Sequence, residues 1–270
     1  MNTELEKAAA ERLAKSENGL QQVTNQLTVK MAQPNSVSTV TVQGNPASTA
    51  TVAYVVTASN DFGTIDLNTG KYSQIGHMDG LPRALGGLGI VDGKLYGGAI
   101  RTDNLYEVDA SNGTVNLVGA GKISYFMTGS TTKALYAVGQ DLNLYSIDTK
   151  SGVATLIGPT GFNPATAGGV ALSSGSETLY MSAGTNGSAG ATLYSLSTAT
   201  GAARTIGFLG SGTGAPPMVF ENDTLYAAFD FPSQKICTLN TTTGAPSCLA
   251  SASGVPGFFY GLAPASLYPF

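Results

Sequence analysis

A short two-strand pattern recurs five times along this chain, and this repeat limits the possible folds more than any other feature of the sequence. Its clearest copies are NLYEVDASNGTVNLVG at 104–119 and NLYSIDTKSGVATLIG at 143–158. Weaker copies run over 62–76, 192–207 and 235–249. Each copy reads as a hairpin whose turn ends in a glycine. These glycines follow one another at intervals of 39 to 49 residues, at Gly70, Gly113, Gly152, Gly201 and Gly244.

The residues of each turn have conformational roles. A type I turn followed by one left-handed residue closes a hairpin with a bulge, and glycine adopts that left-handed conformation at the lowest cost. A short polar residue before the turn accepts hydrogen bonds from turn N–H groups. The residues at this position, which we therefore interpret as structural rather than catalytic, are Asp66, Asp109, Asp148 and Asn240.

A second pair of predicted strands precedes each hairpin. A glycine-rich apolar strand comes first and a Leu-Tyr strand second, as at 168–172 and 178–183. Four strands recurring at this interval are typical of propeller blades, in which small residues suit the crowded innermost strand. The sequence therefore predicts an all-β fold, a five-bladed β-propeller of four-stranded blades. We expect the tyrosines of the second strands to pack in the core, namely Tyr54, Tyr96, Tyr136, Tyr180, Tyr226 and Tyr268.

The two ends of the repeat region indicate how the ring closes. The chain enters near Val52 on a second-strand copy and returns through an innermost-strand copy at 258–262. The late strand is expected to complete the blade that the early strands begin, because such closure removes exposed sheet edges. The propeller is predicted to span residues 52–270.

The residues before the repeats differ in composition. Residues 1–33 are rich in Glu, Lys, Ala, Gln and Leu, which predicts a helical segment. Leu13, Leu20 and Leu27 lie seven residues apart, as in a coiled-coil seam. The segment is either an oligomerisation device, a helix docked on the propeller or a frayed tail. Residues 34–51 are predicted to be a linker or an edge strand.

Composition narrows the classes of partner. Charged residues make up 11% of the chain, Gly contributes 35 residues, and the net charge is -4. Low charge with many small polar residues favours an extracellular or periplasmic, surface-associated protein. The chain has no basic stripe, so we expect no nucleic-acid partner. It has no run of 18 apolar residues and no apolar stretch directly after Met1, so we expect neither a membrane span nor an uncleaved secretory signal.

The two cysteines lie on the two arms of the fifth hairpin. The register set by its turn makes Cys237 and Cys248 cross-strand neighbours, close enough for a disulfide. Two packed thiols are the alternative, and a disulfide would imply an oxidising compartment. A metal site is excluded by count, because His77 is the only histidine and belongs to another repeat.

Residues suited to catalysis are few. His77 is predicted to be a solvated loop residue, and no nucleophile motif, phosphate-binding loop, dinucleotide fingerprint or EF-hand is present. We therefore expect no cofactor. This inventory favours a non-enzymatic protein without excluding an enzyme. Paired carboxylates at the mouth of the ring could serve glycoside hydrolysis, with possible members Asp61, Asp79, Asp103, Asp141 and Asp230.

The hairpin that reads LYSIDTKSGVATLIG at 144–158 resembles those of secreted bacterial β-propeller proteins, including quinoprotein-like and YncE-like repeats. The resemblance covers roughly residues 52 to 270 and implies a fold rather than an activity. The chain contains no Trp, which departs from the Trp-bearing blades of quinoprotein enzymes. The resemblance therefore does not imply a bound quinone.

Loop lengths indicate which face of the ring is expected to bind a ligand. The longer connections are expected on one face, and functional residues usually lie on loops held by a rigid scaffold. The ligand-binding residues nominated on this basis are Arg83, Arg101, Asp103, Tyr125, Phe162, Asn163, Phe231 and Tyr260. We expect a non-enzymatic extracellular module for assembly or binding: a surface fibre, filament or virion subunit, or an adhesin. Its partner would be another copy of itself or a cell-surface glycan or protein. The alternative is a propeller glycoside hydrolase or lyase.

Overall fold

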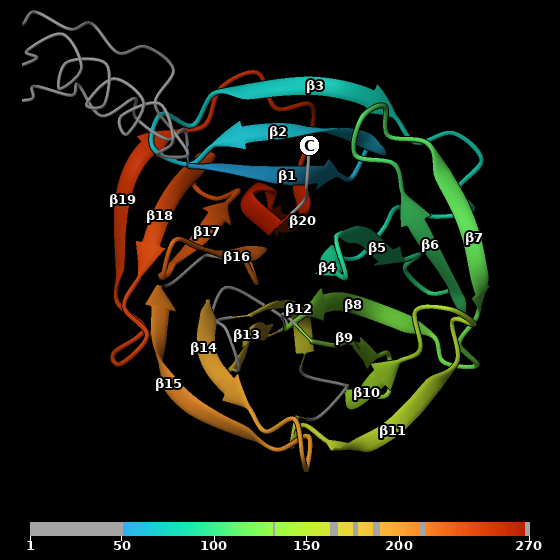
Figure 1. Ribbon diagram of the computed structural model, residues 1–270. Coiled ribbons are helices and arrows are strands. Elements are labelled where there is room, and N and C mark those ends of the chain that lie inside the picture. Colours follow the sequence, from blue (N-terminus) through green and yellow to red (C-terminus); the bar gives the residue numbers. More distant parts are fainter. Residues whose placement is uncertain are drawn as a thin grey trace, which may run out of the picture. The chain divides into compact units, whose positions relative to one another are not determined.

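A computed structural model describes residues 51–131, 133–162, 167–174, 178–185, 190–210 and 214–267. Thr51–Phe270 forms one compact unit. The predicted helical segment at 1–33 and the linker at 34–51 lie outside the described residues, apart from Thr51. In Figure 1 the sheets of the compact unit stand around a common centre, as the blades of a propeller do.

Five sheets of four antiparallel strands make up this unit. Blade 1 comprises β20 (Phe259–Pro264), β1 (Val52–Thr57), β2 (Asp61–Asp66) and β3 (Tyr72–His77). Blade 2 comprises β4 (Gly89–Val91), β5 (Lys94–Gly98), β6 (Asn104–Val108) and β7 (Val115–Ala120). Blade 3 comprises β8 (Tyr125–Ser130), β9 (Leu135–Gly139), β10 (Asn143–Ile147) and β11 (Ala154–Pro159). Blade 4 comprises β12 (Ala167–Ser174), β13 (Leu179–Thr185), β14 (Ala191–Leu196) and β15 (Ala203–Gly210). Blade 5 comprises β16 (Met218–Glu221), β17 (Thr224–Phe229), β18 (Lys235–Leu239) and β19 (Pro246–Ser251), and the 3-10 helix η1 (Ala265–Leu267) follows β20.

The predicted five-bladed propeller of four-stranded blades is confirmed, and so is the way in which the ring closes. Strand β20 is the innermost strand of blade 1 and pairs with β1, with Val55 opposite Leu262. The innermost strands β4, β8, β12, β16 and β20 surround the centre in Figure 1, whereas β3, β7, β11, β15 and β19 run along the perimeter. The first blade therefore joins two distant parts of the chain by backbone hydrogen bonds.

The turn chemistry is also as predicted. The five turn glycines have φ between 72° and 80°, in the left-handed region. In blade 3 the N–H of Gly152 donates to the carbonyl oxygen of Asp148 at 2.8 Å. The Asp148 carboxylate accepts from the N–H groups of Ser151 and Lys150, which lowers the pKa of Asp148. These acids therefore hold the turns.

A second glycine, present in four of the five repeats, lies at the contact between neighbouring blades. Gly158, near the end of β11, lies against the carbonyl group of Thr200 in the turn of blade 4, so that a side chain at Gly158 would collide with that carbonyl oxygen. The same contact joins three other pairs of blades, through Gly76 and Asn112, Gly119 and Ser151, and Gly207 and Thr243. The Ile-Gly or Val-Gly ending of these four repeats therefore allows neighbouring blades to approach closely.

The second-strand tyrosines that the structure describes are buried in the core or half-buried at its margin. Tyr54, Tyr96 and Tyr226 are buried, whereas Tyr136 and Tyr180 are half-buried at its margin. The ring of Tyr54 stacks on Phe62, and Tyr180 stacks on Phe220. Tyr268 lies outside the described residues. Aromatic side chains thus supply much of the packing within and between blades, as expected.

In every blade the two outer strands have a corresponding cross-strand residue pair directly beside a β-bulge. We call such a pair a rung, and the two residues of this rung differ from blade to blade. Blades 2 and 3 have Tyr106 opposite Leu117 and Tyr145 opposite Leu156. Blade 4 has Tyr194 opposite Thr205. In blade 1 the rung pairs Gly63 with Gln74, and the ring of Tyr72 lies 2.7 Å from where a Gly63 side chain would begin. A large residue on β3 thus fills the space that a glycine on β2 leaves.

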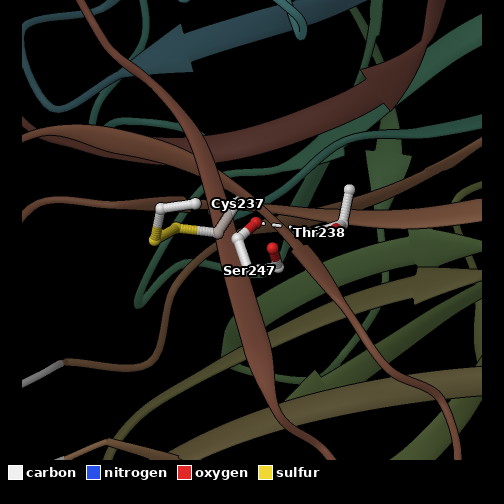
Figure 2. The surroundings of a disulfide bond; sticks show 4 residues. Cys237, Thr238 and Ser247 are labelled. Carbon is white, nitrogen blue, oxygen red and sulfur yellow. Dashed lines mark hydrogen bonds between the residues drawn. A yellow bond between two sulfur atoms is a disulfide. The ribbon is translucent and has the colours of Figure 1, made fainter.

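Blade 5 carries a disulfide at this rung, as the sequence predicts. Cys237 of β18 pairs with Cys248 of β19, and the sulfur atoms are bonded, with the Cα atoms 3.8 Å apart (Figure 2). On the next rung the Thr238 hydroxyl donates to the carbonyl oxygen of Ser247 at 3.3 Å. The disulfide ties together the two strands whose adjoining loops form the site described below.

Candidate ligand-binding surface

Three loops meet where blade 5 adjoins blade 1: the β17–β18 loop, the β19–β20 loop and the β1–β2 loop. The Ala58 N–H donates to the carbonyl oxygen of Phe258 at 2.9 Å, which joins the second and third of these loops. The Gln234 side-chain amide donates to the carbonyl oxygen of Gly257 at 2.7 Å, which joins the first and second. We call this region the loop cluster.

Two phenylalanines of the loop cluster expose their rings to solvent. Phe231 of the β17–β18 loop is 52% exposed and Phe258 of the β19–β20 loop is 51% exposed. The ring centroids are 5.5 Å apart and the ring planes are inclined by 34°. Exposed single apolar residues are common on proteins, but two adjacent aromatic rings from different loops form a contact surface suited to a partner.

Asp230 and Gln234 hold the loops beneath this pair. One Asp230 carboxylate oxygen accepts from the Gln234 side-chain amide and from the Phe259 N–H, both at 3.2 Å. Burial raises the pKa of Asp230, and these two hydrogen bonds oppose the rise. The bond from Phe259 joins the β17–β18 loop to the end of the β19–β20 loop, whereas the bond from Gln234 lies within the β17–β18 loop. Together with the Gln234–Gly257 bond, the Asp230–Phe259 bond ties the two loops that carry the rings to each other. Ordered loops of this kind lower the entropic cost of binding.

Three polar residues lie on the blade 1 side of the loop cluster. One Asp61 carboxylate oxygen accepts from the Gln74 side-chain amide at 3.1 Å and lies 3.0 Å from Nδ1 of His77. The chain from Ala58, which bonds Phe258, to Asp61 spans no more than about 11 Å. We call Asp61, Gln74 and His77 the polar rim. Against prediction, His77 is the last residue of β3, where the register sets it opposite Asp61, and not a loop residue.

The predicted site residues spread over several blades. Phe231 belongs to the aromatic pair. Arg83 is exposed on the β3–β4 loop, and Arg101 and Asp103 are exposed on the β5–β6 loop. Tyr260 of β20 is half-buried and packs against the core cluster of blades 1 and 2. The structure thus places one of these five in the aromatic pair.

The three other nominated residues are Tyr125, Phe162 and Asn163. Phe162 is half-buried and packs edge-to-face against Tyr194, with ring centroids 4.7 Å apart. Asn163 lies outside the described residues. The nomination of Tyr125 as a surface contact is wrong, because its side chain is fully buried. Tyr125 opens the innermost strand β8, and its ring occupies the space beside Gly98, which has no side chain to fill it.

The sequence analysis missed Phe258, although a signal for it exists. Phe258 and Phe259 are adjacent at the start of β20, and successive side chains of a strand point to opposite faces. Only Phe259 is buried. One exposed aromatic ring is the expected result of such a pair at a strand end. Asp230 appeared only as one of five carboxylates, because its partner Phe259 is distant in sequence.

Within the described part of the chain, no group of three or more His, Cys, Asp and Glu residues is arranged to hold a metal ion. The same residues include no helix long and apolar enough to cross a membrane. Comparison of the sequence with known protein families and with curated proteins gave no match, so the functional argument depends on the fold and on the geometry of the loop cluster.

Proposed function

We propose that this chain is a non-enzymatic binding module of an extracellular or periplasmic surface, and that it engages its ligand through the loop cluster. The observation that carries the proposal is the exposed Phe231–Phe258 pair. Aromatic side chains are enriched at interfaces because they bury a large area with few rotatable bonds. Of the roles expected from the sequence, this feature supports an adhesin-like module better than a fibre, filament or virion subunit.

The frame beneath the rings supports the same role. The bonds from Phe259 to Asp230 and from Gln234 to Gly257 join two loops, and the disulfide of blade 5 joins the strands that lead into them. Gln234 directly precedes β18 and the β19–β20 loop directly follows β19. A site built on strands that are locked together keeps its geometry better than one on free loops.

The disulfide and the low charge support the location. Structural disulfides persist in oxidising compartments and are rare in the cytosol. Charged residues make up 11% of the chain, against about 25% in an average globular protein. An extracellular or periplasmic surface is therefore the environment that we propose.

The proposal is tested with two arrays, one of defined glycans and one of extracellular proteins, probed with the fluorescently labelled full chain. We expect wild-type protein to bind at least one spot and the double variant F231A/F258A to lose that binding. Leu117→Ala is the matched control, because Leu117 is 60% exposed on β7 of another blade. Failure of the wild type to bind either array, or equal binding by the double variant, would overturn the proposal.

A further inference from the structure

We infer that the ligand of the loop cluster is a neutral saccharide whose pyranose rings stack on Phe231 and Phe258. This inference depends on the proposed binding function and names the chemical class of the ligand. Three properties of the loop cluster carry it: the shape of the aromatic surface, the polar groups next to it and the sign of the surrounding charge.

The shape of the aromatic surface suits a sugar ring. The two rings are inclined by 34° and each side chain is about half exposed, so that aromatic surface of both is open to solvent. One face of a pyranose carries axial C–H groups, and the electron-rich face of an aromatic ring attracts such weakly positive hydrogens. A pyranose lying on either ring buries its apolar face and leaves its hydroxyl groups pointing outward at the edge.

The polar groups at that edge match sugar hydroxyl groups. A hydroxyl group donates one hydrogen bond and accepts others, so carboxylates and amides are suitable partners. Asp230 directly precedes Phe231 and uses one carboxylate oxygen in the loop frame. Its other carboxylate oxygen accepts no hydrogen bond from any described residue, which leaves an acceptor beside the ring. The polar rim adds a carboxylate, an amide and an imidazole on blade 1, and its Asp61 lies three residues along the chain from Ala58, which bonds Phe258.

The charges around the loop cluster favour a neutral saccharide over an anionic one. Asp230 and Asp61 are carboxylates, and Asp79 lies 3.9 Å from Nε2 of His77. The chain as a whole carries a net charge of -4. Acidic groups around a binding surface repel an anionic polymer and disfavour its approach. The same charges leave the binding of a neutral oligosaccharide unaffected.

Isothermal titration calorimetry tests the inference with five probes. Maltohexaose, cellohexaose and chitohexaose are the neutral probes, and polygalacturonate and hyaluronan are the anionic ones. We expect at least one neutral probe to bind and neither anionic probe to bind. Phe231→Ala and Phe258→Ala should each weaken binding by about tenfold or more, which corresponds to about 1.4 kcal/mol. Phe231→Trp should preserve or strengthen it, because a larger aromatic face remains.

The controls separate this inference from the proposed function. Leu117→Ala should bind as the wild type does, and circular dichroism of each variant establishes that it is folded. Binding of an extracellular protein, lost in F231A/F258A, without binding of any neutral probe would overturn the saccharide inference but leave the proposed function standing. Saccharide binding that F231A/F258A does not change would overturn both. Release of reducing ends from a bound probe would contradict a non-enzymatic role.

Discussion

Cys237 lies opposite Cys248 at the rung where Tyr106 lies opposite Leu117 in blade 2 and Tyr145 lies opposite Leu156 in blade 3. A covalent bond thus replaces an aromatic–aliphatic pair. The replacement occurs in the blade that carries two of the three loops of the loop cluster. It therefore stabilises the part of the ring on which the proposed site depends.

Removing the disulfide should destabilise the protein measurably. The bond closes a short loop with a sequence separation of 11, so we expect its loss in C237A/C248A to lower the unfolding free energy by about 2 to 3 kcal/mol. Urea unfolding monitored by circular dichroism measures this change. Reduction of the wild type by dithiothreitol should reproduce it.

A second double variant tests whether the residue pair of blades 2 and 3 can replace the disulfide in blade 5. C237Y/C248L installs the pair found in blades 2 and 3, and it should recover part of the lost free energy while becoming insensitive to dithiothreitol. If reduced and oxidised wild-type protein unfold at the same urea concentration, the disulfide has no stabilising role.

Gly158→Ala should weaken the contact between blades 3 and 4. The added methyl group would collide with the carbonyl oxygen of Thr200, and overpacking of this kind costs about 1 to 3 kcal/mol. Gly158 is not in the left-handed region, so the substitution tests space alone. Gly214→Ala is the control, because nothing lies within 4 Å of its added methyl group. Equal urea midpoints for the two variants would refute the proposed role of Gly158.

Tyr72 should tolerate the loss of its hydroxyl group but not of its ring. Tyr72→Ala empties the space beside Gly63 and should cost about 3 to 5 kcal/mol. Tyr72→Phe should be neutral or stabilising by about 1 kcal/mol, because the buried hydroxyl group has no hydrogen-bond partner among the described residues. Urea unfolding near neutral pH checks both values.

The titration of Tyr72 gives an independent check. Burial, and then the charge of Asp61, raise the pKa of Tyr72 to about 12, above the unfolded value of about 10. The folded state therefore holds the proton more tightly, and stability should fall as the pH rises from about 10 to about 12. Tyr72→Phe should lose less stability over that interval than the wild type. An equal loss in the two proteins would contradict the raised pKa.

Asp230→Asn should make the protein more stable relative to the wild type as the pH rises from acidic to neutral. Burial raises the pKa of Asp230 above the unfolded value of about 3.9, so the contribution of Asp230 to the unfolding free energy falls as the pH rises from the unfolded pKa through the folded one. The asparagine side chain of the variant keeps an acceptor oxygen and does not titrate. The variant should therefore gain stability relative to the wild type from acidic to neutral pH, as urea midpoints at several pH values would show.

The comparison with the wild type is necessary because other acids act in the opposite sense. Hydrogen bonds from Ser111 and Ser151 lower the pKa values of Asp109 and Asp148, respectively, and the stability that these acids supply is lost as the pH falls. That loss is common to both proteins and cancels in the difference. A constant difference across the pH range would show that Asp230 does not titrate abnormally.

The fold was predictable because its determinants are local and repeated. The turn at Asp148 and Gly152 needs only residues that are adjacent in sequence, and the register of a tight turn determined that Cys237 meets Cys248. Ring closure followed from the order of the strands: the chain enters near Val52 on a second-strand copy and returns through an innermost-strand copy. The turn and the disulfide need only the order of residues along one hairpin, and ring closure needs only the order of the repeated strands.

The site was less predictable because contacts between blades create it. Phe231 and Phe258 lie on different loops, and Asp230 of one loop accepts a hydrogen bond from Phe259 at the end of the other. Tyr125 is buried because Gly98, on a strand that precedes it by more than twenty residues, leaves room for its ring. Loop length along the chain reveals where side chains can vary, but it does not reveal which of them face a neighbouring blade.

Closure through β20 determines when during synthesis the propeller can finish folding. During translation β1, β2 and β3 emerge first, yet their sheet lacks its innermost strand until the ribosome has produced all the other blades. The exposed edge of β1 must stay unpaired throughout that interval, when it is open to association with other nascent chains. The propeller can therefore reach its final form only after β20 has left the ribosome, and a chain that ends just before β20 would have four complete blades and a three-stranded blade 1.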